Sequence, residues 1–214
     1  MSLTLPTLPE GRVLDVVRAP SHVLSVPGSL VDPADPSIAQ LAADLVATMR
    51  VSPGCVGLAA PQVGISAQAF CVDVSGHPKT RTSHGLIVLV NAEVLDASRN
   101  EKGREGCMSV PDLTGDVKRA TKITVAGQLP LSGERVLIST DAFEARAMLH
   151  EIDHCNGMLF LDRVTSAHAV HPRKVYLEAE ENPGQGLHDG DNSPVRSGNL
   201  APRVGSGNDE RSGI

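Results

Sequence analysis

Aromatic residues are almost missing from this 214-residue sequence, which has one Tyr, three Phe and no Trp. Any core must therefore be built mainly from aliphatic side chains, and a hydrophobic content of 41% is sufficient for one. Proteins that stack nucleic-acid bases need aromatic platforms, and phosphate binding needs a basic surface, whereas this chain carries a formal net charge of −6. The composition therefore disfavours direct, sequence-specific binding of nucleic acid.

Long hydrophobic runs are also lacking, since no stretch approaches the roughly 20 apolar residues of a membrane span. The N-terminal sequence MSLTLPTLPEGR has no basic start followed by an apolar run, so no signal peptide is expected. The cysteines form no CxxC pair, which favours free thiols or a metal ligand over disulfides; they are Cys55, Cys71, Cys107 and Cys155. These absences predict a protein of the reducing cytoplasm with no membrane partner.

Composition divides the chain into three parts. Residues 1–12 are rich in Pro and Leu and are expected to form an extended arm. Residues 13–181 are expected to form one folded domain. Residues 182–214 are rich in Gly, Pro, Ser and Asn and poor in large apolar residues, so burial there cannot offset the entropy of ordering. We expect a disordered C-terminal tail.

Local signals predict two helices. The first begins at Asp35-Pro36, with Asp as N-cap and Pro at the first helical position, and it ends at Ser52-Pro53-Gly54. Apolar residues at three- and four-residue spacing give it one hydrophobic face. The second runs over 141–156, with Asp141 and Glu144 forming most of a capping box and Asn156-Gly157 as a left-handed stop.

Short runs of strand-forming residues occur at 69–74, 86–95, 121–126 and 135–138. No helix-length segment separates them, and parallel pairing would need long crossovers, so the pairing should be mostly antiparallel. The fold class is therefore α+β, with mostly antiparallel β-sheets packed around the late helix and an additional early amphipathic helix.

The late helix carries HEIDH, residues 150–154. His150 and His154 are four residues apart and project from one face, a spacing that suits a divalent transition metal. Glu151 beside them can take a proton from a water on that metal. Two surface histidines on an ordinary helix would give the same pentapeptide, and a catalytic site needs a third protein ligand from elsewhere.

Two upstream segments supply candidates: GLAAPQVG, residues 57–64, and EGCMS, residues 105–109. Together with HEIDH, and in this order, they resemble the GxGLAAxQ, EGCxS and HExDH motifs of the peptide deformylase family. The similarity extends to segments that start at Leu14, Val90, Lys118 and Leu159. Deformylases remove the formyl group from the N-terminal formyl-methionine of newly made polypeptides, so formyl-methionyl nascent chains are the implied partner and a transient ribosome contact is expected.

The resemblance also implies a set of site residues. The metal ligands would be Cys107, His150 and His154, with water in the fourth position. Fe(II) is the usual metal of the family, and Zn(II), Ni(II) or Co(II) suit the same thiolate and imidazole donors. Glu151 would act first as general base and then as general acid.

The remaining implied roles concern the substrate. The side-chain amide of Gln62 and the backbone N–H of Met108 would stabilise the oxyanion. Gly57 would let the peptide backbone approach closely, and Val56 would line the apolar pocket for the methionine side chain.

One departure from the family pattern concerns the first glycine of GxGLAAxQ, which is Cys55 here. If that position requires positive φ or contacts substrate, Cys would strain or block it, although Gly54 could absorb the change. Two alternatives therefore stay open. An HExxH metallopeptidase would have no use for Cys107 as a ligand, and a deformylase-like paralogue would bind metal or formyl peptides with little turnover.

Overall fold

The computed structural model describes residues 4–173. The predicted tail, 182–214, and the end of the predicted domain, 174–181, lie outside the described residues. The domain boundaries themselves stay a prediction. None of the described helices is long and apolar enough to cross a membrane.

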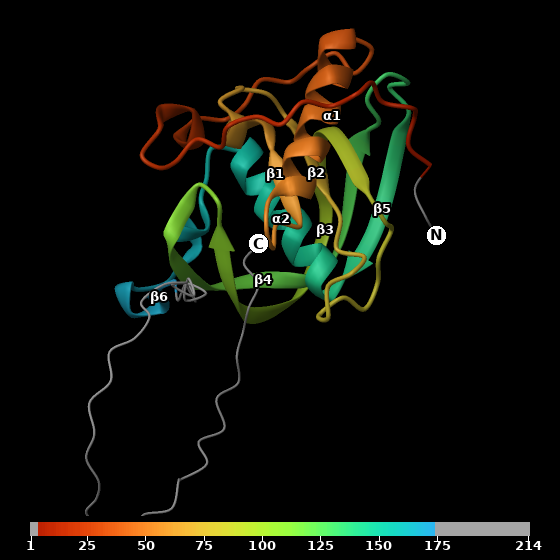
Figure 1. Cartoon of the computed structure of the whole chain (residues 1–214). Coiled ribbons are helices and arrows are strands. Elements are labelled where there is room, and N and C mark those ends of the chain that lie inside the picture. Colours follow the sequence, from red (N-terminus) through yellow and green to blue (C-terminus); the bar gives the residue numbers. More distant parts are fainter. Residues whose placement is uncertain (1–3, 174–214) are drawn as a thin grey trace, which may run out of the picture. The chain divides into compact units, whose positions relative to one another are not determined.

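The described residues form one six-stranded sheet and two α-helices (Figure 1). The strands lie in the order β1-β2-β3-β4-β5, β6 pairs with β4, and all five pairings are antiparallel. The α+β prediction is therefore confirmed. The strands are β1 (Gly57–Ala59), β2 (Ala69–Val72), β3 (Ile87–Cys107), β4 (Val110–Gln128), β5 (Arg135–Asp141) and β6 (Val170–Pro172). The helices are α1 (Pro36–Val51) and α2 (Ala142–Cys155), with short 3-10 helices at His22–Ser25, Ala60–Val63, Phe160–Arg163 and Ala167–Ala169.

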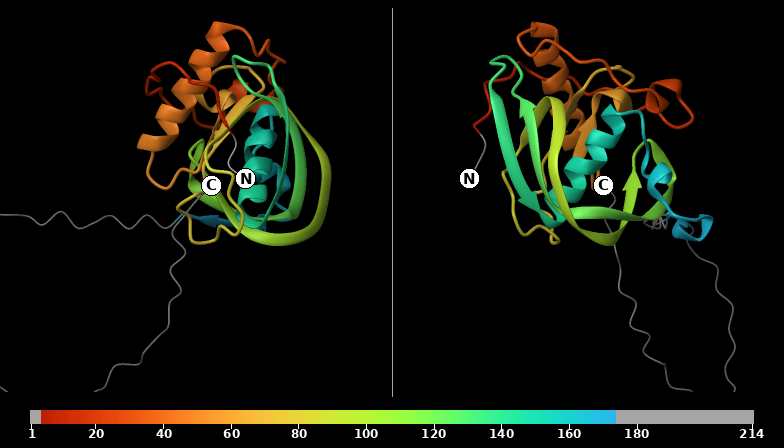
Figure 2. Two further views of the ribbon diagram at one scale, coloured as in Figure 1. Left: turned by 90° about the vertical axis from the view of Figure 1, so that its right-hand side faces the viewer. Right: turned by 180° about the vertical axis from the view of Figure 1, so that it is seen from behind.

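The long hairpin of β3 and β4 curves around α2, as the views from the side and from behind show (Figure 2). Its pairing is interrupted by register shifts between Val90 and Glu93, between Val94 and Asp96, and between Gly106 and Cys107. Such irregularities bend a strand and increase its twist. The hairpin can therefore cover the helix on more than one side.

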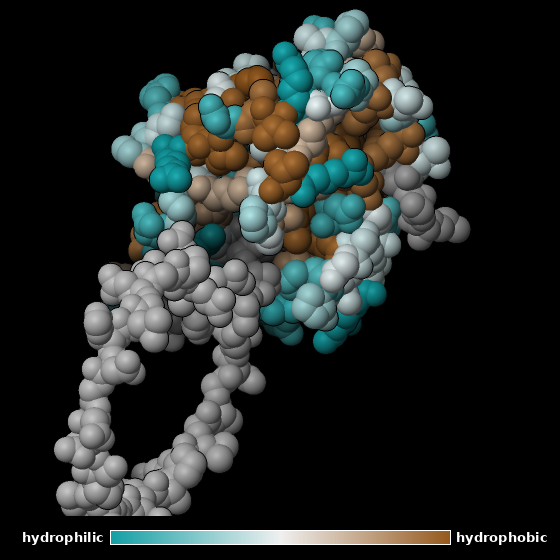
Figure 3. Space-filling view, in the orientation of Figure 1, coloured by the Kyte–Doolittle hydropathy of each residue, from teal (hydrophilic) through white to brown (hydrophobic). Residues whose placement is uncertain are grey.

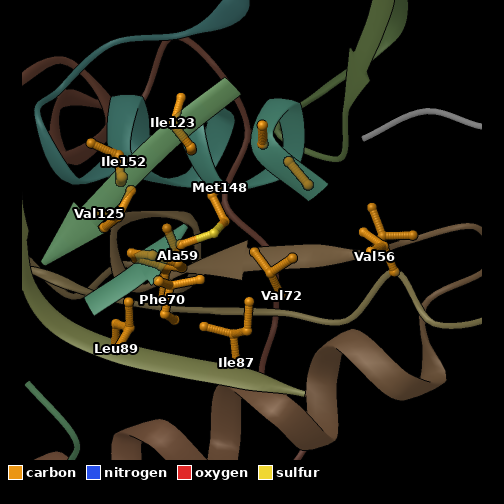
Figure 4. Packing of buried hydrophobic residues seen from close by; sticks show 14 of the residues in the cluster. Val56, Ala59, Phe70, Val72, Ile87, Leu89, Ile123, Val125, Met148 and Ile152 are labelled. Carbon is orange, nitrogen blue, oxygen red and sulfur yellow. The ribbon is translucent and has the colours of Figure 1, made fainter. Parts of the chain in front are cut away.

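The main core lies between α2 and the sheet. Side chains from β1, β2, β3, β4 and α2 point toward one another around Met148, which is fully buried (Figure 4). A second cluster packs the apolar face of α1 against β1, β2 and the start of β3. The sheet therefore separates an outer helix, α1, from an inner one, α2.

The N-terminal segment has no helix or strand from residue 4 to residue 18, and it packs Leu5 and Leu8 against the cores. Arg12 binds Asp44 of α1 through both its backbone N–H, at 2.8 Å, and its guanidinium, at 2.7 Å. On the face shown in Figure 3, apolar side chains reach the surface in the upper part, where this segment and α1 lie in Figure 1.

Both predicted helices are confirmed, but one predicted cap is wrong. Asp35 caps α1 by accepting a hydrogen bond from Ser37 N, and Gly157 adopts positive φ, 73°, just beyond α2. Asp141 occupies the N-cap position of α2 without a side-chain capping bond. The carboxylate of Glu144 instead accepts hydrogen bonds from the hydroxyl of Thr140 and the backbone N–H of His84.

The strand predictions are confirmed in position, but three of the four are too short, whereas the predicted run 69–74 extends past the end of β2 at Val72. β3 and β4 continue through polar stretches toward their shared turn, and β1 and β6 were not predicted as strands. As a result, most of EGCMS lies at the end of a strand. Glu105, Gly106 and Cys107 form the last residues of β3, and β4 begins at Val110.

Candidate metal centre

Three metal-ligand atoms converge between β3 and α2. They belong to Cys107, His150 and His154, lie within 4.8 Å of one another and are buried. The Cys107 Sγ is 3.2 Å from the His154 Nε2. The structure thus brings together all three residues that the sequence suggested as ligands.

Local structure explains this convergence. The two histidines are one helical turn apart on α2, and their ring centroids are 4.9 Å apart. Cys107 ends β3 immediately after a register shift in the β3–β4 pairing. The His150 Nε2 has no hydrogen-bond partner among the described residues, and neither does the His154 Nδ1. One thiol sulfur with imidazole nitrogens is a donor set that suits a divalent transition metal, so these residues fit such an ion.

Burial sets the charge states of this cluster in the protein itself. It raises the pKa of the Cys107 thiol to about 12, with the nearby Glu151 carboxylate adding to the effect. It also lowers the pKa of His154 well below its usual range. Because ligands bind metal as thiolate and neutral imidazole, loading of the site should release a proton from Cys107.

Glu105, from the EGCMS segment, orients His150. Its Oε2 is 3.0 Å from the His150 Nδ1, which directs the other ring nitrogen toward Cys107 and His154. Arg119 donates to both Glu105 oxygens, at 2.7 and 2.9 Å, and Arg146 donates to Oε1 at 2.7 Å. Burial opposes ionisation of Glu105, but the hydrogen bonds from His150 and Arg119 outweigh it and hold its pKa well below the usual range.

Asp153, the second acid of HEIDH, is joined to the same network. Arg119 donates to its Oδ2 at 2.7 Å, and Arg163 donates to both of its oxygens, at 2.5 and 2.9 Å. Arg119 of β4 therefore links an acid of β3 to an acid of α2. This ion-pair network fixes the helix that carries both histidines against the hairpin that carries Cys107.

Glu151 lies beside the ligand cluster and is buried. Its Oε2 has no hydrogen-bond partner among the described residues, and burial raises its pKa well above the usual value. Gly57 of β1 passes so close that a Cβ there would lie 2.5 Å from the Glu151 Oε1. A glycine at this position thus allows β1 to contact the carboxylate directly.

Gln62, in the 3-10 helix that follows β1, also reaches the cluster. Its Nε2 donates to the Cys107 Sγ at 3.2 Å and to the Ser109 Oγ at 3.4 Å. Its Oε1 accepts from the backbone N–H of Ala59 at 2.9 Å, which fixes the orientation of the amide. Gln62 therefore presents N–H groups to the centre.

These groups line a small pocket of about 40 Å³, roughly the space of one or two water molecules. Its lining residues are Pro53, Gly54, Cys55, Gly57, Gln62, Cys107, Met108, His150, Glu151 and Arg173. Val56, the predicted wall of the methionine pocket, belongs to the main core and does not line this pocket. A second, more open hollow shares its Pro53, Gly54 and Cys55 wall.

Cys55 causes no backbone strain. Gly54 has positive φ, 69°, and Cys55 does not, so the glycine next to it provides the left-handed conformation. The Cys55 Sγ donates to the Gly57 carbonyl at 3.1 Å. Burial raises the pKa of Cys55 and of Cys155 to about 12, which favours the neutral thiol in both.

Sequence reasoning missed four charged residues of this region: Glu105, Arg119, Arg146 and Arg173. Glu105 was quoted within EGCMS without a role, and the arginines had no local pattern. The pairing of β3 with β4, and of β6 with β4, brings Glu105, Arg119 and Arg173 to the site. Arg146 lies on α2, one turn before His150, and reaches Glu105 from there.

A buried glutamate beside a Cys/His cluster, on a helix enclosed by an antiparallel sheet, defines a metal-dependent hydrolase centre. The model of the polypeptide deformylase family matches residues 13–170, and the chain belongs to this family. It is therefore a hydrolase that acts as a deformylase in protein biosynthesis.

Known relatives and solved structures agree with this assignment. The chain is 41% identical to the peptide deformylase of Carboxydothermus hydrogenoformans over 151 residues, covering 71% of this chain and 93% of that protein. It is 40% identical to peptide deformylase 1 of Bacillus cereus, covering 72% and 93%. The crystal structure of a class I type b peptide deformylase from Acinetobacter baumannii matches with a TM-score of 0.65 and 36% identity, covering 72% of this chain and 99% of that one. The Thermotoga maritima enzyme matches with a TM-score of 0.65 and 31% identity, again covering 72% and 99%.

Proposed function

We propose that this deformylase removes the formyl group from the N-terminal formyl-methionine of newly made polypeptides and releases formate. The observation that carries the proposal is the convergence of Cys107, His150 and His154 beside the buried Glu151. We place this activity in the bacterial cytoplasm, where nascent chains leave the ribosome, and a transient ribosome contact belongs to the proposal.

The proposed ligands of one divalent transition metal are Cys107, His150 and His154. Fe(II) is the expected ion from the family, and Zn(II), Ni(II) and Co(II) suit the same donors. When bound, such an ion acidifies water and polarises the formyl oxygen. The thiolate of Cys107 would offset part of its charge in this buried site.

Glu151 is the proposed proton carrier. As the attacking water adds to the formyl carbon, its proton passes to the Glu151 carboxylate. The same proton then goes to the amine nitrogen as the C–N bond breaks, which yields formate and a free N-terminus. The raised pKa of Glu151 matches this task, because a carboxylate that ionises too easily is a poor acceptor.

The oxyanion that forms on the formyl oxygen needs hydrogen-bond donors. We assign this role to the amide of Gln62, which already points at Cys107, and to the backbone N–H of Met108, which lines the pocket. Gly57, also on the pocket wall, would admit the peptide backbone, and Val56 next to it would contact the methionine side chain.

The test measures formate released by anaerobically purified protein from formyl-Met-Ala-Ser, with acetyl-Met-Ala-Ser as the matched control. We expect release from the formyl peptide alone, together with about one bound metal ion per chain. A metal-loaded protein that releases no formate would instead be the non-catalytic paralogue.

The Cys107→Ala variant distinguishes the deformylase from the remaining alternative, an HExxH metallopeptidase. Loss of a ligand should lower the metal content and abolish turnover. An HExxH peptidase would keep its metal and would cut internal peptide bonds, which mass spectrometry of the products detects.

A further inference from the structure

Arg173 lines the pocket at the metal site, and the proposed reaction assigns no role to its positive charge. It follows directly after β6, and its backbone N–H donates to the Asp112 carbonyl at 2.8 Å. Because β6 pairs with residues 113–115 of β4, Arg173 is held next to the turn that connects β3 to β4. It is one of the residues that line the pocket.

The guanidinium of Arg173 lies against Gly106, where any side chain would collide with its Nη2. Its one side-chain hydrogen bond to a described residue is long, 3.4 Å from Nη2 to the Cys107 carbonyl. The Nε is buried and has no partner among residues 4–173. The guanidinium thus has N–H donors at the pocket wall that no described residue accepts from.

No ion pair joins Arg173 to any acid within the described part of the chain. β4 carries two acids. Asp112 contacts Arg173 through its backbone carbonyl, without a described ion pair. Asp116 is engaged by Arg104 at 2.7 Å, Lys102 at 3.3 Å and His171 at 3.4 Å. Among the described residues that line the pocket, Glu151 is the only one with a carboxylate, and it is buried beside the ligand cluster. An incoming peptide therefore meets a positive charge that no described acid neutralises.

We propose that Arg173 is a specificity-determining residue that selects peptides with an acidic side chain at either of the two positions after formyl-methionine. The inference rests on the proposed function, because it assumes that the peptide enters through this pocket. A guanidinium binds carboxylates with directed N–H donors, and it repels lysine or arginine at the same position.

The test compares kcat/KM for formyl-Met-X-Ser and formyl-Met-Ala-X peptides with X as Glu, Ala or Lys. In at least one series, we expect Glu to exceed Ala, and Ala to exceed Lys, by about two- to five-fold each, the range of a partly exposed ion pair. The order should weaken in 0.5 M KCl. Arg173→Ala should bring the Glu-to-Lys ratio close to one, Arg173→Lys should keep its direction, and Arg173→Glu should invert it.

Arg135→Ala is the matched control, since it removes the same charge from β5, outside the pocket lining. It should leave the Glu-to-Lys ratio of kcat/KM unchanged.

A wild-type Glu-to-Lys ratio near one, or a ratio that survives Arg173→Ala, would overturn the inference while the deformylase proposal stands. If no peptide released formate, the proposed function would fail. The inference would then be decided by the Kd values of acetyl-Met-Glu-Ser and acetyl-Met-Lys-Ser for wild type and Arg173→Ala.

Discussion

The two helices lie on opposite sides of β1 and β2 and are built in different ways. α1 buries mainly Ala, Leu, Val and Met against the sheet, with Asp44 and Thr48 as its buried polar residues. α2 is buried on nearly all sides, and half of its buried residues are polar or charged: Glu144, Arg146, His150, Glu151, Asp153 and His154.

The polar groups of the two helices are satisfied differently. On α1, Thr48 donates to the Asp44 carbonyl one turn earlier, and Asp44 binds Gln40 and Arg12. On α2, the partners come largely from the sheet and from the loop before it. α1 is therefore an ordinary amphipathic helix, whereas α2 depends on charges that other strands supply. Four measurements would sharpen or break this contrast.

The largest effect should come from Glu151→Gln. Loss of the proposed proton carrier should lower turnover of formyl-Met-Ala-Ser by roughly 10²–10⁴-fold. The metal content should persist, because Glu151 is not a proposed ligand. Glu144→Gln is the control, a buried glutamate on the same helix that does not line the pocket, and it should keep its turnover. Equal losses of turnover in the two variants would contradict the proposed role of Glu151 as the proton carrier.

Arg119→Leu should cost about 3–5 kcal/mol of unfolding free energy, because it leaves Glu105 and Asp153 short of a buried partner. Urea unfolding measures this loss. Arg135→Leu on β5, whose arginine is exposed, should change stability by less than about 0.5 kcal/mol. A small effect of Arg119→Leu would mean that α2 does not depend on this link to the hairpin.

Leu45→Ala tests α1 as a purely structural helix. Leu45 is fully buried, so the cavity should destabilise the protein by about 2–4 kcal/mol. For the protein that remains folded, kcat should match wild type, as measured by formate release below the unfolding transition. Val51→Ala, at an exposed position on the same helix, should have almost no effect on either property. A lower kcat in Leu45→Ala would tie α1 to the site.

The smallest effects should distinguish the two N-caps. Asp35→Ala removes a capping hydrogen bond and should cost about 1 kcal/mol. Asp141→Ala removes a side chain that makes no capping bond, so its cost should be close to zero. The two midpoints of thermal unfolding give the comparison. Equal shifts would show that the Asp141 carboxylate does cap α2 in solution.

Local signals explain which parts of the fold could be predicted. Asp35-Pro36 and Asn156-Gly157 act on the residues next to them in the chain. The start of α1 and the end of α2 were therefore predicted correctly. β1 is a run of only three residues, GLA, without any alternation of polar and apolar residues. The polar outer part of β3 is a strand because β4 pairs with it, a cause that β3 alone does not contain.

The site divides in the same way. Cys107, His150 and His154 were suggested by motif order and helical spacing, which survive in a linear sequence. Arg119 resembles any surface arginine on a strand, and its burial becomes evident only when β4 lies against both β3 and α2. Val56 was inferred from position alone, and its contact with substrate stays a prediction.

The long pairing of β3 with β4 has a consequence for the order of assembly. Both strands precede α2 in the chain, and hairpins form much faster than the roughly 5–20 residues per second of synthesis. We expect the hairpin to close, with Glu105 and Arg119 already joined, before the ribosome has released the helix. The two histidines of α2 would then reach the site last, so the metal ion would bind only after the rest of the domain has folded. A chain that stops between the two stages would expose Glu105 and Arg119 to solvent, because α2 would not yet cover them.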